Sequence, residues 1–149
     1  MTYGYECEYF LLRDGKVVCP VPRRFNRDAS QNLVEVRSGY YSSPTATEES
    51  FRELRESLKL LVKREGFELA SADTFGAETA GFHVHFGAYA VIDMPLIIKT
   101  LDDTFSDEIA STGRKAGQYR MKPYGFEYRS LPSSVSVSKV TKTLWELKP

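Results

Sequence analysis

The sequence predicts an α+β fold, in which helices pack on one face of a mostly antiparallel sheet. Two observations carry this prediction. Several short segments alternate apolar and polar residues, as half-buried strands do, and turn residues separate them. Longer segments repeat apolar residues at three- and four-residue spacing, which is typical of helices that bury one side.

The strands are expected over residues 3–12, 17–19, 33–38, 67–72, 81–88 and 125–131. Loops are expected over 21–32, which is rich in Pro, Asn, Asp and Ser, and over 111–124, which holds Gly and basic residues. We expect Thr47 to be the N-cap of a first helix that ends at Gly66, and Asp93 to cap a second helix that continues to Ile109. A last helix is expected from Val137 to Leu147.

The composition is that of an ordinary soluble globular protein, and the length fits one domain over residues 1–149. Hydrophobic residues make up 42% of the chain, which is enough to bury a core without disulfides. The 20 basic and 20 acidic side chains cancel, so no overall field favours nucleic acid or an anionic membrane. Any anionic ligand must therefore be held by locally placed Arg and Lys side chains.

Cysteine usage and the N-terminal segment both bear on the compartment. Cys7 and Cys19 are too few for a disulfide framework or a zinc site; they could pair, but two buried thiols in a reducing compartment are the favoured interpretation. The segment MTYGYECEYF lacks the basic and apolar regions of a signal peptide, and no run approaches transmembrane length. We therefore expect a cytoplasmic protein.

Four predicted strands each place two functional polar groups two residues apart, and hence on one face. The pairs are Glu6 with Glu8, Glu35 with Arg37, His83 with His85, and Glu127 with Arg129. Large apolar residues stand between and beside them, so the opposite face suits cover by helices. One face of the sheet is therefore expected to be lined by carboxylates, imidazoles and guanidinium groups.

Such a face has the ingredients of a metal and phosphate site. Crowded carboxylates resist joint ionisation unless cations lie between them. Mg²⁺ prefers oxygen ligands and tolerates an imidazole, while Arg offers a planar fork to phosphate oxygens. Each pair alone would usually be a solvated face or a structural ion pair, so the prediction depends on all of them occurring in one small chain.

Taken in order, these motifs resemble the amidoligases, the carboxylate–amine ligases of the glutamine synthetase and glutamate–cysteine ligase superfamily. The similar pieces run from Tyr3 to about Ser134 and comprise E-x-E, LVEVRSGYYSSP, GFHVHFG, RKAGQYR and FEYRSLP. TAGFHVHFG and GFEYRSLPSS are most similar to the versions that phages and bacteria encode. The resemblance implies a glutamine synthetase catalytic-domain-like fold, a curved antiparallel sheet whose concave face holds metals and ATP. It also implies the cytoplasm of a bacterium, or of the host if a phage encodes the chain.

The resemblance implies a metal-dependent ligase reaction. Family members phosphorylate a carboxylate with ATP and then let an amine displace the phosphate, which forms an amide or isopeptide bond. By this similarity Glu6, His83 and Glu127 would hold one Mg²⁺ near the transferred phosphate. Glu8 and Glu35 would hold a second near the acceptor carboxylate, and Mn²⁺ could replace either ion.

The basic residues would contact the nucleotide by the same resemblance. His85 would face the nucleotide phosphates, and Arg120 and Arg129 would neutralise the transferred phosphoryl group. Arg114 and Lys115 belong to a basic segment that family members commonly use on phosphates. The expected partners are small-molecule or peptide carboxylates and amines, and a homo-oligomer that shares its active sites is a further expectation.

Two alternatives remain open at this point. The basic segment from Gly113 to Arg120 is short, which leaves room for a catalytically inactive binding or inhibitory protein that keeps the site for binding alone. Two His and one Glu could instead form the iron site of a β-barrel oxygenase. Against this, the chain has only two histidines, and no Glu follows His85 at short range.

Overall fold

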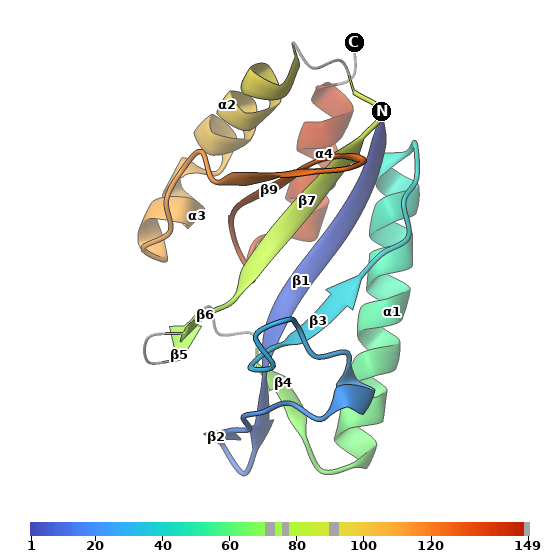
Figure 1. Cartoon of the computed structure of the whole chain (residues 1–149), viewed down its shortest axis with the longest axis vertical. Coiled ribbons are helices and arrows are strands. Elements are labelled where there is room, and N and C mark those ends of the chain that lie inside the picture. Colours follow the sequence, from blue (N-terminus) through green and yellow to red (C-terminus); the bar gives the residue numbers. More distant parts are fainter. Residues whose placement is uncertain (71–73, 76–77, 90–92, 148–149) are drawn as a thin grey trace.

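The computed structural model describes residues 1–70, 74–75, 78–89 and 93–147, and it confirms the α+β prediction (Figure 1). An antiparallel sheet curls into a half-barrel, and helices pack on one of its faces. The helices are α1 (Pro44–Arg64), α2 (Met94–Thr104), α3 (Ser106–Ser111) and α4 (Val137–Glu146), and a 3-10 turn, η1, spans Arg23–Phe25. Among the described residues, no helix has the length and apolar composition needed to cross a membrane.

The first strand organises the sheet. The strands are β1 (Thr2–Arg13), β2 (Lys16–Val17), β3 (Val34–Arg37), β4 (Glu68–Ala70), β7 (Gly81–Gly87), β8 (Tyr119–Lys122) and β9 (Gly125–Pro132), with a separate hairpin of β5 (Thr74–Phe75) and β6 (Glu78–Thr79). The main order is β2-β1-β7-β9-β8, and β3 and β4 also pair with β1. All these pairings are antiparallel, so β1 holds together segments that are far apart in the chain.

Large aromatic side chains fill the dry face of the sheet. Tyr5, Phe51 and Phe82 bring β1, α1 and β7 together, with ring centroids 5.4 to 6.4 Å apart. The hydroxyl of Tyr5 reaches Thr141 Oγ1 on α4 at 2.9 Å, so the buried polar group is satisfied. Each fully buried aromatic ring contributes roughly 1.5–3 kcal/mol. The alternation predicted for β1 is confirmed, because Tyr5 and Cys7 lie in this core.

A bulge interrupts the pairing of β7 with β9. Phe82 pairs with Leu131 but Val84 pairs with Tyr128, so β9 has one extra residue opposite His83. The extra residue shifts the alternation, and Tyr128 and Leu131 can both be fully buried although they are three residues apart. Arg129, between them, is left on the opposite, polar face.

The first helix begins one turn earlier than predicted. Its N-cap is Ser43, whose side chain accepts a hydrogen bond from the backbone N–H of Ala46 at 3.3 Å, and Pro44 occupies the first helical position. The expected N-cap, Thr47, is buried within the first turn, and its hydroxyl donates to the carbonyl of Ser43 at 3.0 Å. The prediction of Thr47 was therefore wrong because Ser-Pro is the stronger start signal.

Two further predictions in the second half of the chain were wrong. The helix expected from Asp93 to Ile109 is two helices that meet at the buried Phe105, after a run of Asp and Thr with low helix propensity. The loop expected over 111–124 contains β8, whose alternation of apolar and basic residues covers only four positions, three of them exposed. The strand expected over 67–72 corresponds to β4. Residues 71–72 of the expected strand lie outside the described residues.

Cys7 and Cys19 do not form a disulfide, and the two thiols lie in different surroundings. Cys7, on β1, is buried in the core, as expected. Cys19 is exposed, which corrects the interpretation that both are buried, and its thiol lies 2.7 Å from Asn32 Oδ1.

Gly125 should tolerate no side chain, because β9 approaches β7 too closely there. A Cβ at this position would lie 1.9 Å from the carbonyl oxygen of Phe86, and backbone within a paired strand cannot move aside. We expect Gly125→Ala to lower the free energy of unfolding by about 3 kcal/mol or more, or to prevent folding. The matched control is Gly66→Ala, which has open space but a φ of +84° and should cost about 1 kcal/mol. Urea unfolding that gave equal losses would contradict this.

Candidate active site

The polar face of the sheet carries the predicted pairs in cross-strand register. Glu6 lies between His83 on β7 and Arg37 on β3, its partners on either side. Glu8 lies directly opposite Glu35. Like charges that face each other across an antiparallel pair destabilise it unless a cation compensates them. The register therefore places an attractive arrangement around Glu6 and a repulsive one at Glu8 and Glu35.

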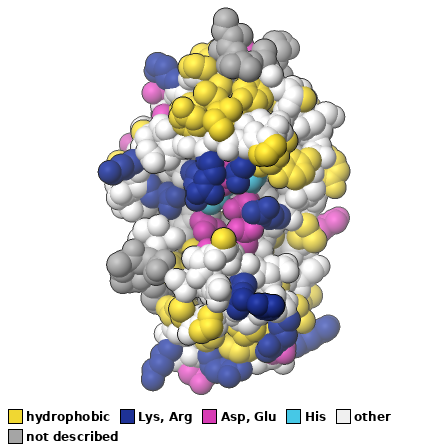
Figure 2. Space-filling model, in the orientation of Figure 1, with side chains coloured by type: hydrophobic (Ala, Val, Ile, Leu, Met, Phe, Trp, Pro, Cys, Tyr) yellow, Lys and Arg dark blue, Asp and Glu magenta, His cyan; other side chains and the backbone are white. Residues whose placement is uncertain are grey.

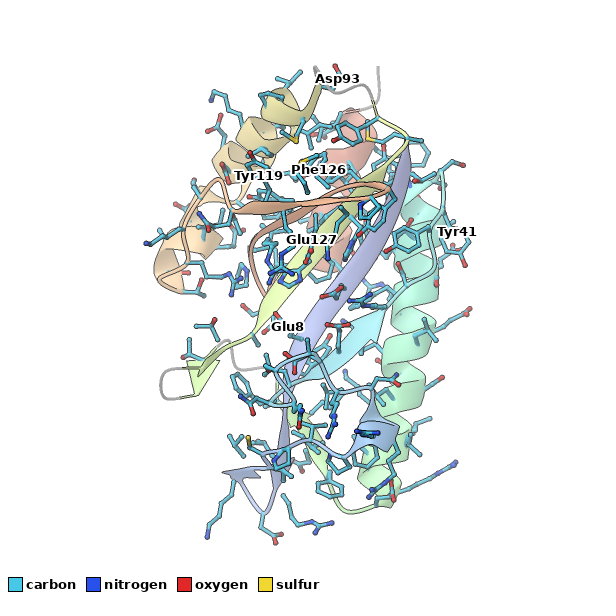
Figure 3. The ribbon with its side chains drawn as sticks, in the orientation of Figure 1. Glu8, Tyr41, Asp93, Tyr119, Phe126 and Glu127 are labelled. Carbon is cyan, nitrogen blue, oxygen red and sulfur yellow. The ribbon has the colours of Figure 1, made fainter. Side chains whose placement is uncertain are left out.

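The other strands extend the same face. Glu127 on β9 pairs with His85 on β7 and with Arg120 on β8. Figure 3 shows Glu8 and Glu127, which come from β1 and β9, near the middle of the molecule. Figure 2 shows Lys and Arg side chains gathered around Asp and Glu side chains at this place, with His between them.

These side chains surround one cavity of about 240 Å³. Five carboxylates and five Lys or Arg side chains line it, together with one imidazole. The charged residues are Glu6, Glu8, Asp28, Glu35, Glu127, Arg27, Arg37, Arg120, Lys122 and Arg129, and the imidazole is that of His83. A cavity with both signs in equal number can hold a cation between its carboxylates and an anion against its guanidinium groups.

The deepest part of the site is a network of two carboxylates and two imidazoles, each at most 3% exposed. His83 Nδ1 lies 3.0 Å from Glu6 Oε1 and 3.0 Å from Glu127 Oε1, so its single N–H is shared between two acceptors. His85 Nε2 lies 3.0 Å from Glu6 Oε2, and His83 Nε2 lies 3.4 Å from Glu8 Oε1. Glu6 thus contacts both histidines at once.

Neighbouring charges and hydrogen bonds determine how these groups titrate. Burial raises the pKa of Glu6, but hydrogen bonds with His83 and His85 outweigh burial and hold the pKa well below its usual range. For Glu127, burial is likewise outweighed by hydrogen bonds with His83 and Lys122, and the pKa falls to about 2. Burial lowers the pKa of His83, but its hydrogen bonds with Glu127 and Glu6 raise it overall.

At the other end of the cavity, the pKa values of Glu8 and Glu35 are raised rather than lowered. Burial and then the charge of Glu6 raise the pKa of Glu35 to about 7, although Arg37 opposes the rise. Burial also raises the pKa of Glu8, whose Oε1 accepts a hydrogen bond from the Gly81 N–H at 3.1 Å. At this end of the site, burial therefore outweighs the nearby positive charge.

The innermost residues fit a divalent cation. Glu6, His85 and Glu127 each offer a ligand atom, and these atoms all lie within 4.8 Å of one another. His83 Nε2 and Glu127 Oε2 are buried, and each lies near one charged atom: Glu8 Oε1 is 3.4 Å from the imidazole nitrogen, and Lys122 Nζ is 3.0 Å from the carboxylate oxygen. Two carboxylates with an imidazole suit a hard ion such as Mg²⁺. The structure brings together both His83 and His85 here, whereas the resemblance implied His83 for the metal and His85 for phosphate.

The surrounding cations neutralise these carboxylates from the cavity rim. Arg37 Nη2 lies 3.0 Å from Glu6 Oε2 and its Nε contacts Glu35, while Arg129 forms an ion pair with Glu127. The side chain of Arg37 is 57% exposed and that of Arg129 29%, so both can also reach a ligand.

Residues 5–148 match the model of a protein family described as phage phiEco32-like COOH·NH2 ligase, type 2. The chain belongs to this family. The match spans nearly the whole sequence and confirms the resemblance to carboxylate–amine ligases that the motifs indicated. No curated protein matches the sequence.

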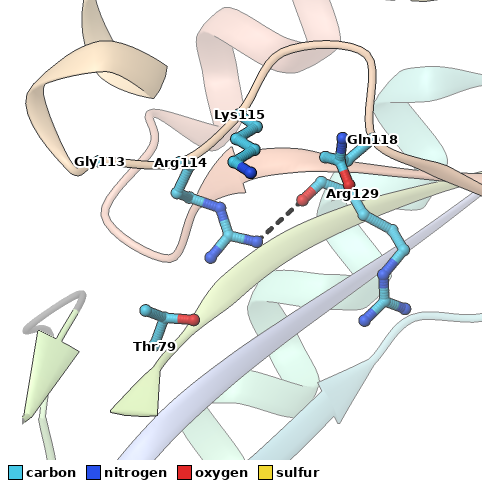
Figure 4. A pocket seen from close by; sticks show the side chains of 6 residues that line it. All are labelled: Thr79, Gly113, Arg114, Lys115, Gln118 and Arg129. Carbon is cyan, nitrogen blue, oxygen red and sulfur yellow. Dashed lines mark hydrogen bonds between the residues drawn. The ribbon is translucent and has the colours of Figure 1, made fainter. Parts of the chain in front are cut away.

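The short basic segment of this family member lines a second cavity of about 220 Å³ (Figure 4). The guanidinium of Arg114 donates to three backbone carbonyls, those of Ala80 at 3.3 Å, Arg129 at 2.8 Å and Ser130 at 3.1 Å. Arg114 therefore joins the segment to β9 and to the start of β7. Lys115 is exposed at the same pocket, and Arg129 lines this pocket as well as the central one.

Sequence reasoning missed several residues of the site. Arg27 and Asp28 come from the loop before β3, and Lys122 comes from the unpredicted β8. Tyr124, in the turn between β8 and β9, places its hydroxyl against His85 Nδ1. The alternation of Arg120 and Lys122 was the available signal, but it has meaning only once their segment is known to be a strand.

In the absence of divalent cations, the protein should be most stable at mildly acidic pH and lose stability toward pH 8. The pKa of Glu35 rises from 4.5 to about 7 on folding, so its ionisation costs stability across that range, and the raised pKa of His83 acts in the same direction. The lowered pKa of Glu127 stabilises above about pH 4.5 and is lost only toward pH 2. Thermal melts with a chelator from pH 4 to 8 measure this.

Glu35→Gln should reduce the loss of stability between about pH 4.5 and pH 7 by an amount on the order of 2 kcal/mol, because the carboxyl whose pKa differs between the folded and unfolded states in that range is gone. An unchanged slope in the variant would show that another group causes the decline.

Arg114 should stabilise the fold rather than bind a ligand. We expect Arg114→Lys to lower the free energy of unfolding by about 2–3 kcal/mol, because an ammonium cannot serve three carbonyls in the geometry of a guanidinium. The neighbouring Lys115→Gln, on an exposed side chain, should stay within about 0.5 kcal/mol of the wild type. Urea unfolding of both variants tests this prediction, and equal losses of stability would show that Arg114 has no special structural role.

Proposed function

We propose that the chain is an ATP- and Mg²⁺-dependent ligase that joins a carboxylate to an amine through an acyl phosphate. The observation that carries the proposal is the buried set of Glu6, His85 and Glu127, whose ligand atoms lie within 4.8 Å of one another beside a rim of Arg and Lys. The family match supports the reaction class, and the buried carboxylates beside basic side chains support a metal nucleotide as the co-substrate.

Glu6, His85 and Glu127 would hold one Mg²⁺, and Mn²⁺ suits the same ligands. Glu8 and Glu35 would hold a second, because they face each other across β1 and β3 and both have raised pKa values. Bound there, the ions would neutralise negative charge on the phosphates and lower the barrier to phosphoryl transfer.

The reaction has two balanced steps. In the first, a carboxylate oxygen of the substrate attacks the γ-phosphorus of ATP, ADP leaves, and an acyl phosphate forms. In the second, an amine nitrogen attacks the acyl carbon, phosphate leaves, and the nitrogen loses a proton. Neither step needs an oxidant or reductant.

The chain's own cations would orient the phosphates in both steps. Arg120, Lys122 and Arg129 line the cavity from β8 and β9, on the same face as the carboxylates. Arg129 offers a fork to two phosphate oxygens at once, and its ion pair with Glu127 keeps it beside the metal ligands. The substrates would be small-molecule or peptide carboxylates and amines.

The proposal predicts that Glu127→Gln abolishes turnover. Purified protein should release ADP from MgATP only with suitable carboxylates and amines, supplied as pools, and the variant should lose at least about 100-fold in rate with its metal ligand. The variant should also be less stable, since ionised Glu127 is favoured by His83 and Lys122. Circular dichroism at the assay temperature therefore accompanies each rate.

Glu65→Gln is the matched control, because Glu65 pairs with Arg24 at the surface and lies outside the cavity. It should keep the full rate. Equal rates in the wild type and Glu127→Gln would point to a contaminant and contradict the ligase proposal. A MgATP-induced rise in melting temperature without turnover in any pool would favour the inactive binding protein instead.

A further inference from the structure

A third cavity, of about 460 Å³, lies at the other end of β7 from the basic segment. Thr2, Tyr40, Gly87, Ala88 and Tyr124 line it, so it has no charged side chain among the described lining residues. The rings of Tyr40 and Tyr124 are 5.6 Å apart at an interplanar angle of 60°. They are 50% and 42% exposed, so both rings are accessible to a ligand.

One imidazole separates this cavity from the metal-ligand carboxylates. His85 packs edge-on against Tyr40, with ring centroids 6.0 Å apart, and its Nδ1 contacts the hydroxyl of Tyr124. Its Nε2 lies 3.0 Å from Glu6 Oε2. A ligand that occupied the aromatic cavity would therefore be one side chain away from the site that handles phosphate in the proposed function.

Gly4 determines where the ring of Tyr40 lies. Gly4 is the cross-strand partner of His85, and a Cβ at Gly4 would come within 2.7 Å of Tyr40 Cε1. The ring thus occupies the space that any other residue at position 4 would fill. Because Tyr40 is half exposed, a methyl group at position 4 would displace its ring rather than the strand.

We infer that the aromatic cavity binds the base of a purine nucleoside triphosphate whose phosphates reach the central cavity. This inference rests on the proposed function and adds the residues that hold the base. Aromatic rings bind a planar, uncharged ring through its face or edge, and a purine offers them a larger ring face than a pyrimidine does.

The lining also argues against discrimination between adenine and guanine. The polar side-chain groups of the lining are the hydroxyls of Thr2, Tyr40 and Tyr124. A hydroxyl both donates and accepts, so it can meet the amino group of adenine or the carbonyl of guanine. ATP and GTP should therefore bind with affinities that differ by less than about fivefold.

The test compares MgATP, MgGTP and magnesium tripolyphosphate, which carries the anionic chain without a ring. Calorimetry should show that the wild type binds both nucleotides roughly 5- to 150-fold more tightly than tripolyphosphate, the range that base stacking provides. Tyr40→Ala and Gly4→Ala should each bring the affinity for MgATP close to that of tripolyphosphate. Neither variant should change the affinity for tripolyphosphate itself.

Tyr41→Ala is the matched control, because Tyr41 is 41% exposed on the same segment and does not line the cavity. It should bind all three ligands as the wild type does. Unchanged MgATP affinity in Tyr40→Ala overturns the inference, as does equal affinity of the wild type for MgATP and tripolyphosphate; both results leave the phosphate site standing. Failure of the wild type to bind either ligand overturns the proposed function itself. A GTP affinity far below that for ATP overturns the lack of discrimination.

Discussion

The register of β1 is the constraint on which both the core and the site depend. Its alternation puts Tyr5 and Cys7 into the dry core and Glu6 and Glu8 into the charged cavity. A slip of one residue against β3 or β7 would exchange the two sets and leave carboxylates among aromatic rings. Burying an unpaired charge costs far more than any single ladder hydrogen bond contributes, so the charged face helps to specify the register that creates it.

The four buried or half-buried glutamates of the site fall into two pairs, which differ in how far neighbouring groups favour the ionised form. Glu6 and Glu127 contact imidazoles and basic side chains, and their pKa values fall below the usual range. Glu8 and Glu35 face each other, burial outweighs their contacts with His83 and Arg37, and their pKa values rise. Added positive charge therefore stabilises the protein most at the second pair, whereas the first pair already has partners that a metal would have to replace.

The sequence predicts the features that depend on local periodicity. It predicts much less of what depends on contacts between segments that are far apart in the chain. A period of two is enough to assign Glu127 and Arg129 to one face and Tyr128 to the other, and the structure agrees. It does not reveal the bulge opposite His83, because one inserted residue leaves no compositional trace. Nor does it find Tyr40 or Tyr124, which come from connecting segments and join His85 only through tertiary packing. The alternating polar face indicated a metal and phosphate site, whereas the family resemblance is the source of the proposed nucleotide and of the proposed role of each residue.

The three cavities lie along β7 in an order that suits a two-substrate reaction. The aromatic cavity includes Gly87 at one end of the strand, the central cavity includes His83, and the basic one includes Thr79 just before the other end. Seven residues of strand span roughly 20 Å, which is long enough for two ligands to approach a shared centre from opposite ends. Arg129 lines both the central and the basic cavity, so an anion entering from the basic end would meet the same guanidinium that pairs with Glu127. The described residues that line the aromatic cavity carry no such charge, so the two ends of β7 would favour ligands of different chemistry.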